Sequence, residues 1–305
     1  MVRVIGFLVG LGFVMVAAWS LLWGAIAFIG DPPKPTVEHE FHKHPKHLAL
    51  ASDGPMGKFD RAQLQRGFQV YKEVCAACHG LGLVAFRNLE DLGYNEPEVK
   101  AIANQWQIEV PDINPDTGEP ATRKALPADR FPQPYANEVA ARAANNNALP
   151  PDLSLITKAR EGGAAYLYSL LTGYQNPPAN LPKESRPGPN LHYNPYFANL
   201  NIAMPPPLVA EGQVTYADGT KPTVDQMAKD VSAFLVWTAE PKLENRRSAG
   251  FAVLAFLLVA TILAYLSYRN IWSGMKSRAV RATGPLDPEN MAKREAASRE
   301  AGIEG

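Results

Sequence analysis

Two long apolar runs without charged residues limit how this chain can fold. The first covers residues 4–30 and directly follows Arg3, and the second covers residues 250–268 and has arginines on both sides. A helix needs about 20 apolar residues to cross the hydrocarbon core of a bilayer, and both runs approach or exceed that length. We expect a transmembrane helix over residues 249–269, because a buried core helix fits poorly with so long an apolar run bounded by arginines.

Residues 1–30 have two interpretations, a secretory signal or an uncleaved anchor helix. Ala25-Ile26-Ala27 resembles a small-residue cleavage site, but the apolar core of a signal usually spans about 7–15 residues. This run is longer and contains Trp19 and Trp23, which suit the interface between membrane and water. We favour the anchor.

The two runs also predict an orientation. Under either interpretation Arg3 stays in the cytoplasm, the chain is exported from Asp31 onward, and the second run returns it. Basic residues then follow in the expected cytoplasmic tail, residues 270–305, and just before it: Arg269, Lys276, Arg278 and Arg281. This agrees with the positive-inside rule, although basic residues at 242, 246 and 247 weaken the contrast.

The balance of charge excludes one class of partner. The chain has 30 basic and 30 acidic side chains and no formal net charge. A nucleic-acid-binding chain usually carries a basic excess, so we expect no nucleic-acid binding. The 27 prolines predict long irregular segments between the helices.

The only two cysteines of the chain, Cys75 and Cys78, lie in "CAACH", and His79 follows the second. A disulfide-exchange pair belongs near a βαβ unit, which the surrounding pattern does not predict. A zinc site would need a second ligand pair, and the sequence has no other cysteine to supply it. The remaining interpretation is covalent haem attachment, whose signature is C-x-x-C-H. Each thiol would add to a haem vinyl group, and the imidazole of His79 would bind the iron.

The residues before this motif predict the helix that carries it. Asp60 can cap its start and Gly80 can end it. Apolar residues and the two cysteines then follow at spacings of four, three, four and three: Leu64, Phe68, Tyr71, Cys75 and Cys78. These spacings put one apolar stripe on the helix. We expect this helix to pack against a second one over residues 223–237, with Gly67 allowing a close approach.

The second axial ligand of such an iron is usually Met or His. Met204 lies in "NIAMPPPL", and three prolines favour a stiff extended segment that can hold a thioether against a flat ring. His192 is the main alternative. Met227 has the pattern of a core residue. A Met–His pair raises the reduction potential and fills both axial positions, which suits electron transfer rather than oxygen binding.

Three loop segments carry further hypotheses. The Asn- and Pro-rich residues 128–154 cannot build a core alone, and we expect them to wrap the haem. Four histidines at 39–47 admit a metal site, but we favour a solvated tether over residues 31–56. The acidic segment, residues 90–119, is either a solvated face or a surface that attracts a basic electron acceptor. Its acidic residues, with Lys100 alone opposing them in the segment, are Glu90, Asp91, Glu96, Glu98, Glu109, Asp112, Asp116 and Glu119.

Several stretches together resemble the cytochrome c1 family, the haem c subunits of the ubiquinol–cytochrome c oxidoreductase, or cytochrome bc1 complex. They are "RGFQVYKEVCAACHG", "ARAANNNALPPDLS", "SLLTGY", "IAMPPPL" and "YADGTKPTVDQMAKDV", and they occur in the order of the family from about residue 57 to 276. The resemblance implies a mainly α fold. Residues 57–245 would form a class I-type cytochrome c domain with long loops, between the N-terminal apolar helix and a C-terminal transmembrane helix.

The resemblance also implies a cofactor and its ligands. One haem c would be attached covalently at Cys75 and Cys78, with His79 and Met204 as axial ligands. Arg142, in "ARAANN", would lie near a propionate. Two features depart from the family: the N-terminal apolar run is unlike an ordinary cleaved bacterial signal, and the chain lacks the extra cysteine pair that some bacterial members use as a disulfide.

The implied function is electron transfer without substrate chemistry on this chain. Electrons would come from a Rieske iron–sulfur protein and pass to a cytochrome c, within a dimeric complex that also contains cytochrome b. The haem domain would lie on the periplasmic side of a bacterial inner membrane. Two alternatives are a peroxidase-like haem enzyme with an open iron position and a c-type subunit of a terminal oxidase.

Overall fold

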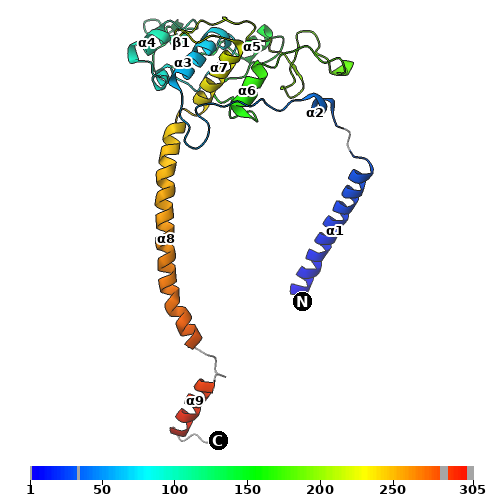
Figure 1. The fold of residues 1–305 in the computed structure, drawn as a ribbon, viewed down its shortest axis with the longest axis vertical. Helices are drawn as coiled ribbons and strands as arrows, with labels where there is room; N and C mark the ends of the chain where they lie inside the picture. Colours follow the sequence, from blue (N-terminus) through cyan, green and yellow to red (C-terminus); the bar gives the residue numbers. More distant parts are fainter. Residues whose placement is uncertain (1, 33–34, 282–287, 301–305) are drawn as a thin grey trace. The chain divides into compact units, whose positions relative to one another are not determined.

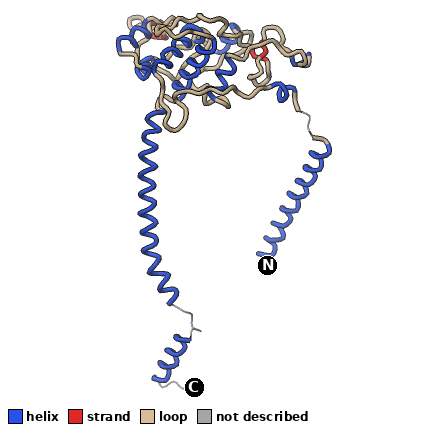
Figure 2. Tube along the Cα trace, in the orientation of Figure 1, coloured by secondary structure: helices blue, strands red, loops and turns tan. Residues whose placement is uncertain are grey.

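A computed structural model describes residues 2–32, 35–281 and 288–300, without the side chains of residues 274–281 and 288–289. The chain divides after Pro241 into two compact units, and each is described by itself. Helices dominate both units, and long loops connect the helices of the first (Figures 1 and 2). The prediction of a mainly α fold is confirmed.

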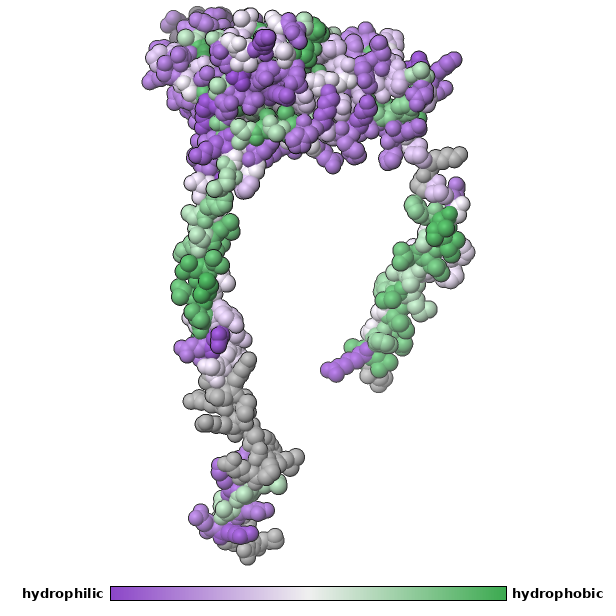
Figure 3. All heavy atoms as spheres, in the orientation of Figure 1, coloured by the Kyte–Doolittle hydropathy of each residue, from purple (hydrophilic) through white to green (hydrophobic). Residues whose placement is uncertain are grey.

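Two helices carry the apolar runs, α1 (Val2–Gly30) in the first unit and α8 (Leu243–Arg281) in the second. Both are long and apolar enough to cross a membrane, over Val2–Gly30 and Leu243–Ser273. Their apolar side chains are exposed along almost the whole described length (Figure 3). Such surface is stable in lipid rather than in water, so the structure agrees with two membrane helices.

The residues after the second span are described only in part. The helix α9 (Pro288–Glu300) follows α8 and is polar. Lys276, Arg278 and Arg281, on which the expected orientation partly rests, have side chains outside the described residues.

Helices α3 (Arg61–Val70) and α7 (Val224–Ala239) form the centre of the first unit. Asp60 caps α3 as predicted, because its side chain accepts hydrogen bonds from the backbone N–H groups of Ala62 and Gln63. Thr223 caps α7 by accepting from the backbone N–H of Gln226. The predicted packing of these helices is confirmed, and Met227 lies in the core without exposed surface.

The two helices cross at Gly67 without room for a side chain. A Cβ atom built there would lie 2.7 Å from the Cβ of Phe234 and would overlap the backbone carbonyl oxygen of Asp230. Backbone atoms cannot move aside as a flexible side chain can. Gly67 therefore sets the distance between α3 and α7.

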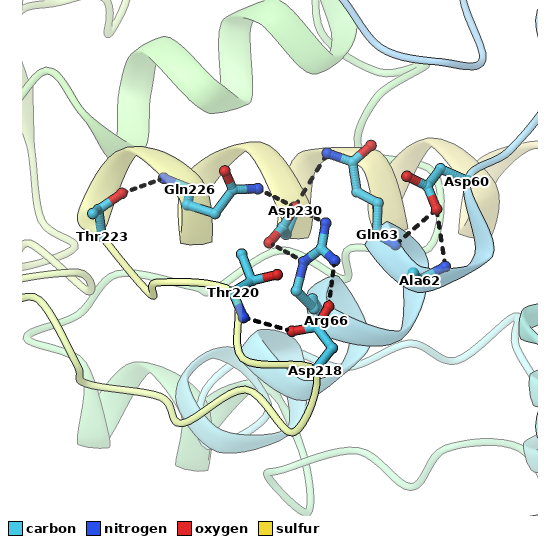
Figure 4. A network of polar contacts seen from close by, with 9 residues as sticks. All are labelled: Asp60, Ala62, Gln63, Arg66, Asp218, Thr220, Thr223, Gln226 and Asp230. Atoms are coloured by element: carbon cyan, nitrogen blue, oxygen red, sulfur yellow. Dashed lines mark hydrogen bonds and ion pairs between the residues drawn. The ribbon is translucent and has the colours of Figure 1, made fainter.

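A buried carboxylate ties the same crossing together (Figure 4). Asp230 is fully buried on α7, and its Oδ2 atom pairs with Nε of Arg66 on α3 at 2.9 Å. Its Oδ1 atom accepts hydrogen bonds from the amides of Gln63 and Gln226 at 3.1 and 2.8 Å. Arg66 also pairs with Asp218 at 2.7 Å. These partners replace the water that a buried charge loses, and they fix the rotation of α3 against α7.

An aromatic cluster covers another side of α3. Phe68 and Tyr71 contact Phe131, which also packs against Phe86 at 4.2 Å and Trp106 at 5.0 Å between ring centroids. The cluster is buried and holds the loops that carry these residues. Those loops connect the 3₁₀ helix η2 (Phe86–Leu92), α4 (Glu96–Asn104) and an antiparallel hairpin of β1 (Val110–Ile113) and β2 (Pro120–Arg123).

The hairpin changes the charge balance expected for the acidic segment. Asp112 pairs with Arg123 at 3.0 Å, and Glu109 pairs with Lys124 at 3.2 Å. Both cations come from beyond residue 119, and the antiparallel pairing of β1 with β2 brings them opposite the acids. The unpaired negative charge is therefore concentrated nearer Glu90–Glu98 than the sequence alone indicates.

Residues 37–52, which we call the strap, pack against the domain rather than extending into solvent. Helix α2 (Val37–Phe41) places its terminal residues against a core cluster of Leu181, Tyr193 and Leu200. Farther along, the backbone N–H of Lys46 donates to Ser169 Oγ and its Nζ to Thr172 Oγ1, both at 2.7 Å. Among the described residues, the histidines at 39–47 included, no group of three or more histidine, cysteine or acidic side chains is placed to hold a metal ion.

The remaining elements of the unit are short. They are α5 (Glu138–Ala144), α6 (Gly163–Leu171), the 3₁₀ helix η3 (Lys183–Ser185), and the paired strands β3 (His192–Tyr193) and β4 (Asn201–Ile202).

We predict that Gly67→Ala destabilises the domain by about 2 kcal/mol, because the new methyl group overlaps backbone atoms of α7 and this outweighs the better helix propensity of alanine. Urea unfolding of the detergent-solubilised chain measures the change. The control is Gly188→Ala, where a Cβ meets nothing within 4 Å; it should stay within about 0.5 kcal/mol of wild type. Equal stability of the two variants would contradict the close crossing.

Candidate functional site

One cavity of about 720 Å³ brings together most of the sequence-predicted site residues. Cys75, Cys78, His79 and Met204 all line it. Much of the rest of the wall comes from the loop after α5, from α6 and from α7, including Leu153, Leu167, Leu170, Leu171, Val231 and Leu235. The wall is mainly apolar, as in most cofactor sites.

The cysteine motif leaves α3 through a wider helical turn. The α-helix ends at Val70, and residues Tyr71–Cys75 form a π-helical turn. The helix predicted to reach Gly80 thus changes geometry before the first cysteine. A π-helical turn holds more residues than an α-helical turn, so the side chains that follow point in other directions than a continued α-helix would give them. Such turns are frequent at functional sites. The Tyr71 hydroxyl donates to the His79 carbonyl oxygen at 2.9 Å and holds the end of the motif against the turn.

The imidazole of His79 has one defined partner. Its Nδ1 atom lies 2.8 Å from the carbonyl oxygen of Pro151, and a carbonyl oxygen only accepts hydrogen bonds, so Nδ1 carries the proton. Burial lowers the pKa of His79 despite opposing effects of the Pro151 carbonyl and Asp152. The ring is therefore neutral at pH 7 with a lone pair on Nε2, the state that a metal requires.

The Cys75 thiol keeps its proton at neutral pH. Burial, with a smaller effect of Cys78, raises the pKa of the Cys75 thiol to about 12. Both side chains are half-buried and free of a disulfide. Neither thiol is used in a disulfide, so both are free to hold a group by thioether bonds.

Asp152 fixes the loop that supplies Pro151. Its Oδ2 atom accepts from the backbone N–H of Gly82 at 2.7 Å, and its Oδ1 atom accepts from that of Ser154 at 2.8 Å. Burial would raise the pKa of Asp152, but hydrogen bonds from Ser154, Gly82 and Gln133 outweigh it and lower the pKa. The charged carboxylate thereby joins the segment after the cysteine motif to the loop that orients His79.

Met204 reaches the cavity from the segment that follows β4. Ile202 pairs with His192 across the short sheet, and Pro205 and Pro207 line the cavity beside Met204. His192, the alternative ligand, lies on β3 outside the cavity wall. The hydroxyl of Tyr174 donates to the carbonyl oxygen of Met204 at 3.1 Å.

The arginine at the cavity wall is Arg160, which the sequence pattern does not single out. Arg142 is exposed, lies outside the wall and donates to the carbonyl oxygen of Asn147 at 3.1 Å. Arg160 and Tyr166 both line the cavity and contact each other. The signal in the sequence is weak: Arg160 lies a few residues before α6, and only the placement of α6 brings it to the cavity.

The donor set fits a haem that is attached covalently. Two thiols and a neutral imidazole lie on one short segment, a thioether comes from another, and an apolar wall with one cationic side chain encloses the space. A porphyrin needs an apolar wall for its ring and polar groups for its carboxylates. Together, the mainly helical fold and this site define a c-type cytochrome.

Comparison with known proteins identifies the family. The model of the Cytochrome C1 family matches residues 50–275. Cytochrome c1 1, a mitochondrial heme protein of Arabidopsis thaliana, is 50% identical over 227 residues, which cover 74% of this chain and 71% of that protein. Cytochrome c1 of Rhodospirillum rubrum is 46% identical over 236 residues, covering 73% and 85% respectively. The mitochondrial cytochrome b-c1 complex catalytic subunit of Candida albicans is 45% identical over 245 residues, covering 79% and 82%. The chain belongs to the cytochrome c1 family, whose cofactor is haem c.

We predict that Asp152→Asn destabilises the domain by about 1 kcal/mol at pH 7, because charged hydrogen bonds are lost. The pKa of Asp152 is lower in the folded state, so its stabilisation is present above the unfolded value of about 3.9 and disappears as the pH falls through the folded value. The difference from wild type should therefore shrink below about pH 4.

Thermal unfolding between pH 3 and 7 measures this effect. Asp116→Asn, which alters an exposed acid in the β1–β2 hairpin, is the control and should change little at any pH. A difference that does not depend on pH would contradict a role for the charged form of Asp152.

Proposed function

We propose that this chain is the membrane-anchored, haem-carrying electron-transfer subunit of a cytochrome bc1 complex. The observation that carries the proposal is the single cavity shared by the side chains of Cys75, Cys78, His79 and Met204. Membership of the cytochrome c1 family and the name of the Candida albicans relative, a cytochrome b-c1 complex subunit, support the assignment to a complex. When bound, the haem supplies reversible one-electron exchange at its iron.

Each residue has a proposed role. Cys75 and Cys78 would hold the haem through thioether bonds, and His79 and Met204 would ligate its iron. The hydrogen bond from His79 Nδ1 to the Pro151 carbonyl orients the ring and increases its basicity. Of the two arginines considered, Arg160 is better placed than Arg142 to neutralise a propionate, because it lines the cavity.

The proposed surroundings follow from the charges and the two spans. Residues 57–245 form the haem domain on the periplasmic side of a bacterial inner membrane, with the strap docked against it. Arg3 in the first turn of α1 and Arg269 near the end of the second span support this orientation. Cytochrome b and a Rieske protein are the proposed partners in the membrane, and a cytochrome c is the proposed acceptor.

We predict that Met204→Leu abolishes the low-spin spectrum of the reduced protein and lowers its midpoint potential by on the order of 100 mV, because a thioether ligand favours ferrous iron. The control is Met227→Leu, which replaces a fully buried core methionine by a residue of similar volume. An unchanged spectrum in Met204→Leu would overturn the ligand assignment and favour an enzyme with an open iron position.

We predict that neutralising Glu90, Asp91 and Glu96 slows electron delivery to a basic cytochrome c about threefold to tenfold at low salt, because these exposed acids would steer it. Glu98 is left intact, since its carboxylate caps α4 through the backbone N–H of Asn95. Stopped-flow rates measure the effect, which should vanish near 1 M salt.

A charge-matched control neutralises three exposed acids outside the acidic segment: Glu161, Glu184 and Glu211. If both triple variants slow delivery equally, net charge and not a docking surface is responsible. Co-purification with a cytochrome b and a Rieske protein, rather than with oxidase subunits, distinguishes the proposed complex from a terminal oxidase.

A further inference from the structure

We propose that Tyr174 is a positioning residue for the thioether of Met204. Its hydroxyl donates to the Met204 carbonyl oxygen at 3.1 Å, while Tyr174 itself lies outside the cavity wall. It therefore acts on the ligand through the ligand's own backbone. This inference rests on the proposed function, in which Met204 binds the iron.

The segment that carries Met204 has little other support. The strand pairing that precedes it ends at Ile202, and residues 205–207 are prolines, which have no N–H to donate. The next fixed point is the carbonyl oxygen of Pro207, which accepts from the Gln213 amide at 2.8 Å. In the part of the chain that the structure describes, the Tyr174 hydroxyl makes the only hydrogen bond that reaches residues 203–206.

Tyr174 lies three residues beyond the end of α6. It follows Gly173, where a Cβ would overlap the ring of Tyr196, so the chain passes close to that ring. The Tyr174 ring also contacts the His192 ring edge-on at 6.5 Å between centroids. The donor thus belongs to a packed part of the domain, whereas the acceptor belongs to a proline-rich loop.

A buried asparagine links α6, which precedes Tyr174, to the β3–β4 hairpin, which precedes Met204. Asn194 is fully buried, and its side-chain amide donates to the carbonyl oxygen of Leu170 on α6 at 2.8 Å. Its backbone N–H donates to the carbonyl oxygen of Leu200, the residue directly before β4. Since Leu170 also lines the cavity, the end of α6, the β3–β4 hairpin and Met204 form one connected support for that side of the cavity.

The consequence concerns the fraction of molecules in which the Met204 sulfur is bound to the iron. A neutral thioether is a weak axial ligand, so its bond depends on how well the protein restricts the sulfur's position. Without the Tyr174 hydroxyl, the Met204 backbone gains freedom, and an external ligand competes more easily with the thioether.

The test uses imidazole as the competing ligand for the oxidised, haem-loaded, full-length chain in detergent. Tyr174→Phe keeps the ring against His192 and removes only the hydroxyl. We expect it to bind imidazole about three- to tenfold more tightly than wild type, the effect of losing one hydrogen bond, as read from the visible spectrum. A low yield does not weaken the test, because only protein that carries haem contributes to the titration.

Two further variants make the result specific. Tyr193→Phe removes a hydroxyl from a buried residue of the same hairpin and should leave imidazole affinity unchanged. In a Met204→Leu background there is no thioether to displace, so Tyr174→Phe should no longer change the affinity. An effect that persists in that background, or that Tyr193→Phe reproduces, would overturn the inference.

The same measurements separate this inference from the proposed function. If Met204→Leu keeps the wild-type spectrum and imidazole affinity, Met204 is not the ligand and the ligand assignment fails. If Met204→Leu opens the iron to imidazole but Tyr174→Phe behaves as wild type, only the role of Tyr174 fails.

Discussion

The contact between the backbones of α3 and α7 at Gly67 is the constraint on which the rest of the haem domain depends. It brings the helix that leads into Cys75 against the helix that supplies Val231 and Leu235 to the cavity wall. The buried Asp230, held by Arg66 and two amides, then fixes the rotation of one helix against the other. Distance and rotation together determine where the cysteine motif begins.

The cavity shows how a c-type site is assembled from segments that have little regular structure. The positions of His79 and Met204 depend on hydrogen bonds to loops as well as on the helices. Carbonyl oxygens from proline-rich loops meet side-chain donors: Pro151 accepts from His79, and Met204 accepts from Tyr174. Proline restricts these loops, and the hydrogen bonds to their carbonyls hold them in place.

Much of this could be predicted from the sequence wherever neighbouring residues decide the outcome. The Asp60 cap, the apolar stripe of α3, the membrane spans and the grouping of the motif with Met204 follow from local pattern. Contacts between distant residues could not be read this way. The docking of the strap, the pairing of Arg123 and Lys124 with acids across a hairpin, and the arrival of Arg160 at the cavity depend on tertiary packing.

The separation of the two cavity walls along the chain has a consequence for biogenesis. Met204 follows Cys78 by 126 residues. If the chain is exported as proposed above, the two thiols and His79 leave the membrane before the thioether does. The β3–β4 hairpin, which precedes Met204, then closes the cavity last. The thioether bonds at Cys75 and Cys78 would thus form before Met204 ligates the iron.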